Sequence, residues 1–363
     1  MIHPDKFVRD GNGRSAGDQT PPWPAPQTGR ASTPFTSTAS ANPPELPRAR
    51  MPSNAELGLS RTRPVPRAGW RKKLHQVTGI NPGESAEQAR QRATLDRINQ
   101  PVRGAFSIAV LSQKGGVGKT TTAIGLGATL ATVRGDRVIA VDANPDFGTL
   151  SQRGPNETRS TVRDVLLDEN IVRYSDIRRH TSQGSSRLEL LASERDPVTS
   201  EAFSDNDYRG VLSVLRRFYN IILTDCGTGL VHSAMSAVLD EADVIVVVAS
   251  PAIDSARSAL ATLDWLEQNG YGHLAAQTTV VLSASRPGPT GLDVDLLASH
   301  FVPRVRALHI IPFDDHLAEG SEINFDLLSR QTRHAFLELA ATIADGFSTL
   351  SARSRNQGAL RRD

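Results

Sequence analysis

From residue 106 onward, short apolar runs alternate with longer amphipathic segments. The apolar runs are rich in Val, Ile and Leu and predict buried strands at residues 106–111, 137–142, 188–192, 220–224, 244–249, 279–282 and 307–311. The amphipathic segments predict helices at residues 122–133, 161–167, 208–218, 254–270 and 327–343, with Asp254 as a helix cap. This alternation predicts an α/β fold, an open, mostly parallel twisted sheet with helices on both faces.

The first hundred residues have a different pattern. Twelve of the 22 prolines fall before residue 67, in a Ser-, Thr- and Pro-rich stretch without apolar periodicity. Such a stretch cannot bury enough apolar surface to offset its conformational entropy, so residues 1–60 are predicted to be a disordered arm. We expect a basic segment with a short helix at residues 61–103, the folded domain at 104–350 and a basic flexible tail at 351–363.

Charge is divided unevenly along the chain. Residues 1–103 carry a net charge of +8 and the remaining residues −6. A polyanionic partner would therefore meet the arm and not the folded domain, although a basic arm also serves solubility alone. Residues 61–80 combine six Lys and Arg with Trp70 and three apolar positions. Such a segment can lie on an anionic membrane surface, grip a nucleic acid backbone, dock on a protein or remain a solvated linker.

The N-terminal residues and the cysteine content indicate the compartment. The first 13 residues are polar and no apolar run approaches the length of a membrane span, so neither a signal peptide nor a transmembrane segment is expected. Cys226 is the single cysteine, which excludes an internal disulfide and fits a reducing cytoplasm. We expect a cytoplasmic protein, with peripheral contact at the inner face of the membrane through residues 61–80 as an alternative.

The strongest chemical signal is a glycine-rich loop between a predicted strand and a predicted helix, Ser-Gln-Lys-Gly-Gly-Val-Gly-Lys-Thr-Thr at residues 112–121. Its glycines let successive backbone N–H groups turn toward an anion, and the next helix adds its positive N-terminal end. Lys119 would reach the β- and γ-phosphates of a nucleotide, and the Thr120 hydroxyl would ligate Mg²⁺. The predicted nucleotide-binding residues are Gly115, Gly116, Val117, Gly118, Lys119, Thr120 and Thr121.

This loop departs from the ordinary phosphate-binding pattern. Gln113 replaces the first glycine, and a second lysine, Lys114, follows it. The string Lys-Gly-Gly-x-Gly-Lys-Thr resembles the deviant Walker A motif of the MinD/ParA family of SIMIBI-class P-loop ATPases. The resemblance covers residues 104–350 and implies ATP and Mg²⁺ as cofactors. It also implies an ATP-dependent homodimer in which Lys114 crosses to the partner's nucleotide.

Two further segments resemble nucleotide-binding elements of this family. Residues 221–229 resemble the Walker B element, which implies that Asp225 binds Mg²⁺ through water and that Gly227 allows close approach to the γ-phosphate. Pro312 and Phe313 stand where the family lines its adenine pocket. The preference for ATP over GTP rests on the resemblance alone.

Residues 142–146, Asp-Ala-Asn-Pro-Asp, resemble the switch I element. In the family an aspartate before the proline orients or activates the attacking water, and Asn144 occupies that position here. An amide can orient water but cannot take its proton, so we expect slow or partner-stimulated hydrolysis. The candidate catalytic residues are Lys114, Lys119, Asn144 and Asp142.

The basic segment Gly69-Trp70-Arg71-Lys72-Lys73, together with residues 141–146 and 224–229, resembles MinD-like ATPases of mycobacteria and related actinobacteria. Those proteins, EspI-like proteins among them, have a proline-rich N-terminal arm and are linked to type VII secretion. The leading hypothesis is a dimeric ATPase switch that regulates or positions a secretion or cell-pole assembly, with a protein partner bound by the arm or the dimer surface. A non-hydrolysing nucleotide-binding scaffold is the first alternative, because Asn144 lacks a basic carboxylate. A ParA-like DNA-partitioning ATPase is the second; the acidic core disfavours it and the basic arm leaves it open.

Overall fold

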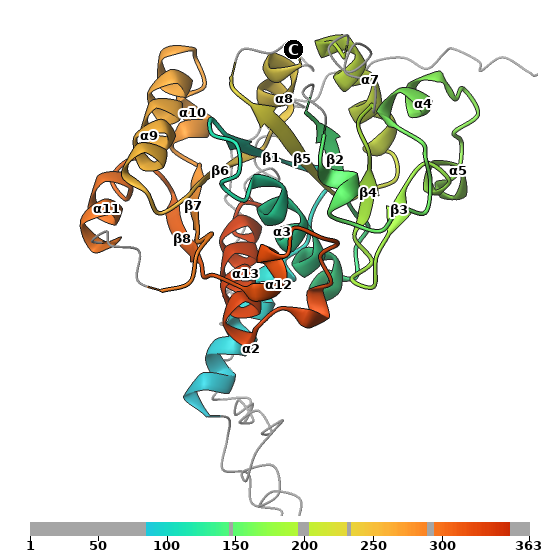
Figure 1. Cartoon of the computed structure of the whole chain (residues 1–363). Coiled ribbons are helices and arrows are strands. Elements are labelled where there is room, and N and C mark those ends of the chain that lie inside the picture. Colours follow the sequence, from blue (N-terminus) through green and yellow to red (C-terminus); the bar gives the residue numbers. More distant parts are fainter. Residues whose placement is uncertain (1–84, 145–147, 195–202, 231–233, 289–293, 349–363) are drawn as a thin grey trace, which may run out of the picture. The chain divides into compact units, whose positions relative to one another are not determined.

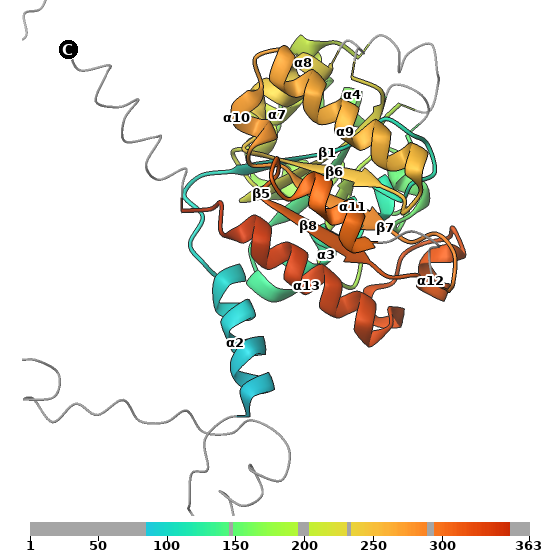
Figure 2. The same cartoon turned by 90° about the vertical axis from the view of Figure 1, so that its left-hand side faces the viewer.

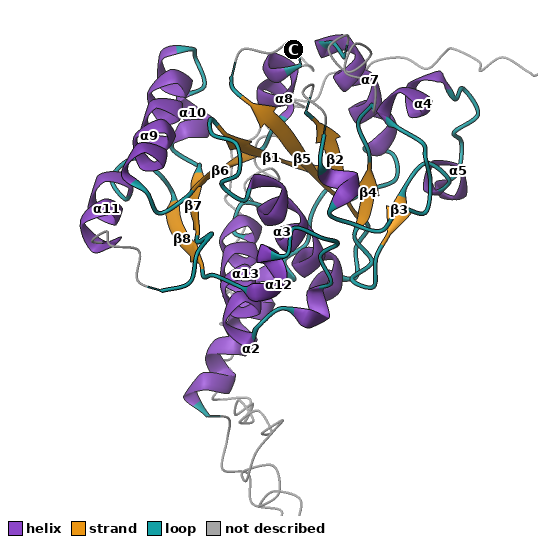
Figure 3. Cartoon of the chain, viewed as in Figure 1, coloured by secondary structure: helices purple, strands orange, loops and turns teal. Residues whose placement is uncertain are grey.

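Strands and helices alternate along the described part of the chain, as Figure 3 shows. The computed structural model describes residues 85–144, 148–194, 203–230, 234–288 and 294–348. The predicted arm, residues 61–84 of the predicted basic segment, the tail and Asp146 lie outside the described residues.

The described strands form one eight-stranded sheet in the order β3-β4-β2-β5-β1-β6-β7-β8 (Figure 1). Every neighbouring pair is parallel except β3 and β4, which are antiparallel. The strands are β1 (Phe106–Ser112), β2 (Val138–Ala143), β3 (Ser182–Gln183), β4 (Glu189–Leu191), β5 (Ile221–Thr228), β6 (Val244–Ala249), β7 (Thr279–Ser283) and β8 (Ala307–Ile311). The predicted α/β fold with a mostly parallel sheet is confirmed.

Helices cover both faces of this sheet (Figure 2). They are α2 (Ala86–Ile98), α3 (Lys119–Arg134), α4 (Val162–Leu167), α5 (Tyr174–Arg178), α7 (Asp205–Leu215), α8 (Met235–Glu241), α9 (Ile253–Gln268), α10 (Gly272–Ala275), α11 (Val294–Phe301), α12 (Asp315–Ala318) and α13 (Arg330–Ala344), with the 3-10 turns η1 (Leu150–Gln152) and η2 (Phe325–Leu327). Two hydrophobic cores result, one on each face. Alternate residues of the central strand enter opposite cores, Ile108 the one beneath α3 and α13 and Ala109 the one beneath α8 and α9. Both faces of the sheet are therefore buried, which explains why the strand sequences are continuous apolar runs.

The contact between α3 and α13 depends on a glycine. A Cβ on Gly125 would lie 2.2 Å from a ring carbon of Phe336, which is fully buried. Helix α2 joins the same layer through a two-pronged ion pair, in which the Arg97 guanidinium donates to the Asp345 carboxylate at 3.1 and 2.7 Å. Thr94 also donates to Glu338 at 3.1 Å. Helix α2 is therefore bound to the folded domain by specific contacts.

Several boundaries differ from the sequence predictions. Helix α9 has Ala252 as its N-cap, so Asp254 lies in its first turn and is not the cap. Helix α13 starts at Arg330, not at residue 327, because the Ser329 side chain caps it and accepts the N–H of Thr332. The predicted strand at 220–224 continues to Thr228, which places Asp225 inside β5. The two-residue strand β3 has no apolar run and was not predicted.

Candidate functional site

The glycine loop lies where β1 ends and α3 begins, at the carboxyl edge of the parallel strands. Gly116 and Gly118 have positive φ angles of 72° and 91°, which only glycine adopts without strain. A Cβ on Gly118 would also lie 2.7 Å from Ser283 Oγ. Gly118 is the N-cap of α3 and provides no side-chain hydrogen bond, so the first N–H groups of the helix have no side-chain cap. This arrangement is an anion-binding geometry.

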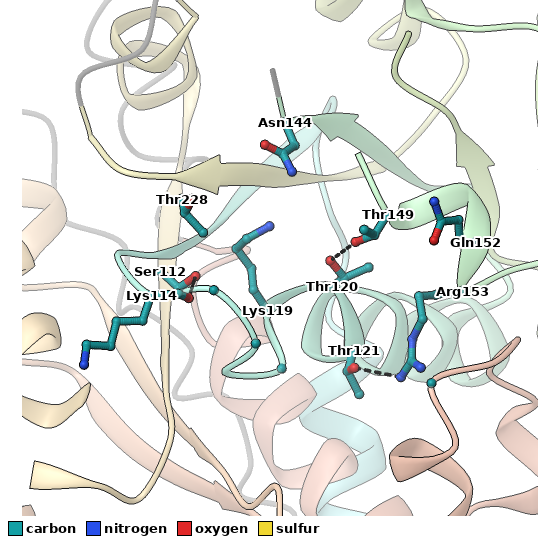
Figure 4. Close-up of a pocket in the computed structure, with 14 residues that line it drawn as sticks. Ser112, Lys114, Lys119, Thr120, Thr121, Asn144, Thr149, Gln152, Arg153 and Thr228 are labelled. Carbon is teal, nitrogen blue, oxygen red and sulfur yellow. Dashed lines mark hydrogen bonds between the residues drawn. The ribbon is translucent and has the colours of Figure 1, made fainter. Parts of the chain in front are cut away.

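A cavity of about 510 Å³ opens over this loop. Backbone groups and polar side chains from the loop and from four later places in the chain line it (Figure 4). The lining residues are Ser112, Lys114, Gly115, Gly116, Gly118, Lys119, Thr120, Thr121, Asn144, Thr149, Gln152, Arg153, Thr228 and Gly320. Most of the predicted site residues therefore surround one cavity.

The floor of this cavity is a cluster of three predicted residues, the buried Lys119 and Asp225 and the half-buried Thr120. Lys119 Nζ donates to Asp225 Oδ1 at 2.7 Å, and the Thr120 hydroxyl donates to Asp225 Oδ2 at 2.7 Å. Asp225 reaches this position because it pairs in register with Val110 of β1 and Asp142 of β2. The sheet thus fixes one carboxylate beneath the start of α3.

The oxygen donors of this floor fit Mg²⁺. Thr120 and Asp225 offer a hydroxyl and a carboxylate 2.7 Å apart, both hard ligands. Within the described ranges, no group of three or more His, Cys, Asp or Glu side chains could hold a metal ion. A cation here would take its other ligands from water and phosphate oxygens, as Mg²⁺ commonly does.

Asp142 is buried at the end of β2 and does not line the cavity. Its carboxylate accepts the backbone N–H of Asn144 and the backbone N–H of Leu150, each at 3.1 Å. Burial first, and then the charge of Asp225, raises the pKa of Asp142 to about 7. Asp142 thus holds both ends of the loop between β2 and η1, while Asn144 itself faces the cavity (Figure 4).

Lys114 lies at the rim, and Figure 4 shows its side chain pointing away from Lys119. Its ammonium group forms an ion pair with the carboxylate of Asp254 in the first turn of α9. The hydrogen bond from Lys114 lowers the pKa of Asp254. Lys114 and Asp254 also line a second cavity of about 670 Å³, bounded by residues 250–252 and 284–288.

A third cavity, of about 200 Å³, adjoins the other side of the glycine loop. Pro312 and Phe313, predicted for the base pocket, line it together with Val117, Thr121 and residues 283–285. Gly227 lies buried in β5 and lines none of the three cavities; its neighbour Thr228 lines the first.

The chain is similar to known proteins both in sequence and in fold. A family described as "AAA domain" matches residues 105–268. The ESX-1 secretion-associated protein EspI of Mycobacterium tuberculosis is 39% identical over 291 residues, which cover 80% of this chain and 44% of EspI. The septum site-determining protein MinD of Synechocystis is 29% identical over 220 residues, 58% of this chain and 77% of that protein. A ParA family ATPase from Chlorobium tepidum has the same fold, with a TM-score of 0.55, 18% identity and coverage of 65% of this chain and 98% of that one.

The chain belongs to the MinD/ParA family of P-loop ATPases. It spans less than half the length of EspI. None of the described helices of this MinD/ParA-family chain is long and apolar enough to cross a membrane.

Sequence reasoning missed several residues around the first cavity of this MinD/ParA-family domain. Thr149 lies 3.2 Å from Thr120, oxygen to oxygen, and Gln152 and Arg153 follow on η1 and directly after it. These residues come soon after the switch-like segment, so their proximity to Asn144 was the available signal. Gly320 comes from beyond β8, and no motif indicated it.

Proposed function

We propose that this protein is a dimeric switch that binds ATP and Mg²⁺ and hydrolyses ATP slowly. The observation that carries this proposal is the hydrogen-bonded cluster of Lys119, Thr120 and Asp225 at the N-terminus of α3, which has no side-chain cap. A lysine, a hydroxyl and a carboxylate at the end of parallel strands form the set that phosphoryl transfer requires.

Each residue has a defined task in this proposal. Thr120 and Asp225 hold Mg²⁺, which when bound neutralises charge on the β- and γ-phosphates. Lys119 exchanges its bond to Asp225 for phosphate oxygens, so its charge stays compensated in both states. The backbone N–H groups of residues 115–118 and the first turn of α3 hold the remaining phosphate oxygens.

Asn144 would position the attacking water. It lines the phosphate cavity at the point where β2 ends, and its backbone is held by Asp142. Because an amide cannot accept the proton of the water, the γ-phosphate or a partner's group must take it. We therefore expect turnover well below that of a site with a carboxylate at this position.

We further propose that ATP closes two copies face to face through Lys114, as the MinD/ParA resemblance implies. Similarity to EspI supports a role in regulating a type VII secretion or cell-pole assembly. In this organisation residues 104–350 form the switch, and the arm at 1–60, the basic segment at 61–103 or the dimer surface meets the partner. Contact of residues 61–80 with a membrane surface belongs to the same proposal.

Steady-state ATP turnover tests the enzymatic part. Wild type should hydrolyse ATP slowly, Lys119→Ala should abolish turnover, and Asn144→Asp should raise it. An inert wild type beside an active Asn144→Asp would instead identify a nucleotide-bound scaffold. Equal turnover in wild type and Lys119→Ala would show that the glycine loop takes no part in the reaction.

Sedimentation with and without ATP tests the dimer. Lys114→Ala should bind nucleotide as wild type does and lose ATP-dependent dimerisation. A variant that still dimerises with ATP would exclude the role of Lys114 across the interface.

The presence of Asn144 in the phosphate cavity favours the scaffold as the second candidate function. A DNA-partitioning role is the third; the acidic core disfavours it and the basic arm leaves it open. It predicts ATP-dependent, salt-sensitive DNA binding, and binding that persisted after deletion of the arm would assign it to the folded domain.

A further inference from the structure

Three cations line the phosphate cavity, and they differ in their partners. Lys119 forms an ion pair with Asp225, and Lys114 forms one with Asp254. Arg153 lines the same cavity, and no carboxylate in the described ranges forms an ion pair with it. A partly buried guanidinium without a counter-charge is unfavourable, and an anionic ligand would compensate it.

Arg153 occupies a junction between two parts of the site. One of its terminal nitrogens, Nη2, donates to Thr121 Oγ1 and to the carbonyl oxygen of Leu317, each at 3.0 Å. Figure 4 shows the bond to Thr121, which comes from the first turn of α3. Thr121 lines both the phosphate cavity and the base-side cavity, and Leu317 lines the latter. Arg153 therefore lies where the two cavities meet.

The remaining donors of this guanidinium have no hydrogen-bond partner among the residues that the structure describes. Only Nη2 is used, whereas a guanidinium carries five N–H groups in a planar fork. That fork matches the spacing of two phosphate oxygens. Burial lowers the pKa of Arg153, but an arginine side chain keeps its charge at neutral pH.

We propose that Arg153 binds the α-phosphate of the nucleotide. The inference rests on the proposed function, because it assumes a nucleotide with its base in the smaller cavity and its β- and γ-phosphates over the glycine loop. Lys119 and Thr120 take the β and γ end, so the α-phosphate of such a ligand lies at the junction that Arg153 occupies. Arg153 then contributes equally to ADP and ATP affinity, because both nucleotides carry the α-phosphate.

A purely structural role for Arg153 makes a different prediction. Its bonds join η1 to α3 and to α12, and its own carbonyl oxygen accepts the N–H of Ile323 at 2.9 Å. If it served only as a clamp, its removal would lower the stability of the nucleotide-free protein and leave phosphate recognition intact. Phosphate recognition and stability must therefore be measured separately.

The test uses isothermal titration of the full chain with Mg²⁺ and either ADP or a non-hydrolysable ATP analogue. Arg153→Gln removes the charge and keeps hydrogen-bonding groups, and Arg163→Gln on the exposed side of α4 is the matched control. Arg153→Gln should weaken both ligands by about the same factor, roughly tenfold to a hundredfold. Arg163→Gln should bind both as wild type does. A loss confined to the ATP analogue would place Arg153 at the γ-phosphate and overturn the proposal.

Competition by AMP and adenosine separates a phosphate contact from a clamp. AMP carries only the α-phosphate and adenosine carries none, so wild type should prefer AMP and Arg153→Gln should lose that preference. Thermal melts without nucleotide check folding, and Arg153→Lys, which keeps a charge but not the fork, should give an intermediate AMP preference. A variant that melts at a lower temperature but retains the AMP preference would show that Arg153 is only a clamp.

One further variant separates this inference from the proposed function. If wild type binds neither nucleotide, or Lys119→Ala binds as tightly as wild type, the nucleotide site itself is wrong. If Lys119→Ala fails to bind while Arg153→Gln matches wild type for both ligands, only the assignment of Arg153 is wrong.

Discussion

The two lysines of one glycine loop lie in opposite environments. The Lys119 side chain is 9% exposed and its partner Asp225 is 1% exposed, whereas Lys114 and its partner Asp254 are 39% and 69% exposed. The first pair is held between strands and the first turn of α3, and the second joins a loop to the start of α9. Lys119 of the buried ion pair thus lies only five positions along the sequence from Lys114 of the exposed one.

This difference indicates how the site is divided. A buried ion pair has already lost its hydration, so each partner depends on the other, and a ligand can replace one only by supplying charge of the same sign. An exposed pair exchanges readily with water or with another molecule. The floor of the cavity is therefore built before any ligand arrives, and the rim can be completed by a partner.

The largest expected effect on stability comes from removing the charge of Asp225 at the floor of the cavity. Asp225→Asn should lower the free energy of unfolding of the nucleotide-free protein by about 3 kcal/mol, because the buried ammonium group of Lys119 loses its counter-charge. Urea denaturation at pH 7 without Mg²⁺ measures the change. Asp254→Asn is the matched control at the rim and should leave the urea midpoint unchanged. Equal midpoints for the two variants would show that burial does not distinguish the pairs.

A second effect comes from the carboxylate beside the floor. The pKa of Asp142 is raised to about 7 from an ordinary value near 3.8, so the folded protein binds this proton more tightly than the unfolded chain. The resulting stability is fully present below the unfolded pKa and is lost as pH rises through 7. Between pH 6 and pH 8, the nucleotide-free, Mg²⁺-free protein should lose roughly 1 kcal/mol from this group.

Urea denaturation across that pH range should show the slope in wild type. Asp142→Asn cannot ionise, so this contribution to the slope should vanish. The variant should also be less stable at pH 6, since its amide nitrogen faces a backbone N–H of Asn144 or Leu150. An unchanged slope in Asp142→Asn would assign the pH dependence to another group.

The cluster of Lys119, Thr120 and Asp225 could be predicted from sequence, whereas the ion pair between Lys114 and Asp254 could not, for a physical reason. Lys119 and Thr120 stand in a contiguous loop whose geometry glycine dictates, and Asp225 ends an apolar run that can only be a buried strand. Parallel strand ends meet at one edge of the sheet, so the cluster followed from the alternation of elements. The alternation of apolar and amphipathic segments also predicted the parallel α/β fold.

The rest of the site depends on contacts that local pattern does not encode. Asp254 was predicted to cap a helix, but Ala252 is the cap, and Asp254 lies in the first turn of α9 with its carboxylate bound to Lys114. Arg153 and Gly320 come together from segments that carry no motif. Strand β3 forms with two residues because β4 offers an edge, not because its own sequence favours a strand.

The smallest expected effect concerns the rim and the proposed dimer. If Lys114 must leave Asp254 to reach a partner's nucleotide, the intramolecular ion pair competes with association. Asp254→Asn removes that competition, and exposed ion pairs are weak, so the dimer should form about two- to fivefold more tightly with ATP. Sedimentation with a non-hydrolysable ATP analogue measures this, and Asp264→Asn, farther along α9, is the matched control for the lost charge.

Lys114→Ala together with Asp254→Asn completes this comparison. The double variant should dimerise no better than Lys114→Ala alone, because the gain from Asp254→Asn acts only through the released lysine. An Asp254→Asn protein that dimerises less tightly than wild type would assign the carboxylate to the interface itself. The ion pair would then belong to the closed state and would not hold Lys114 back.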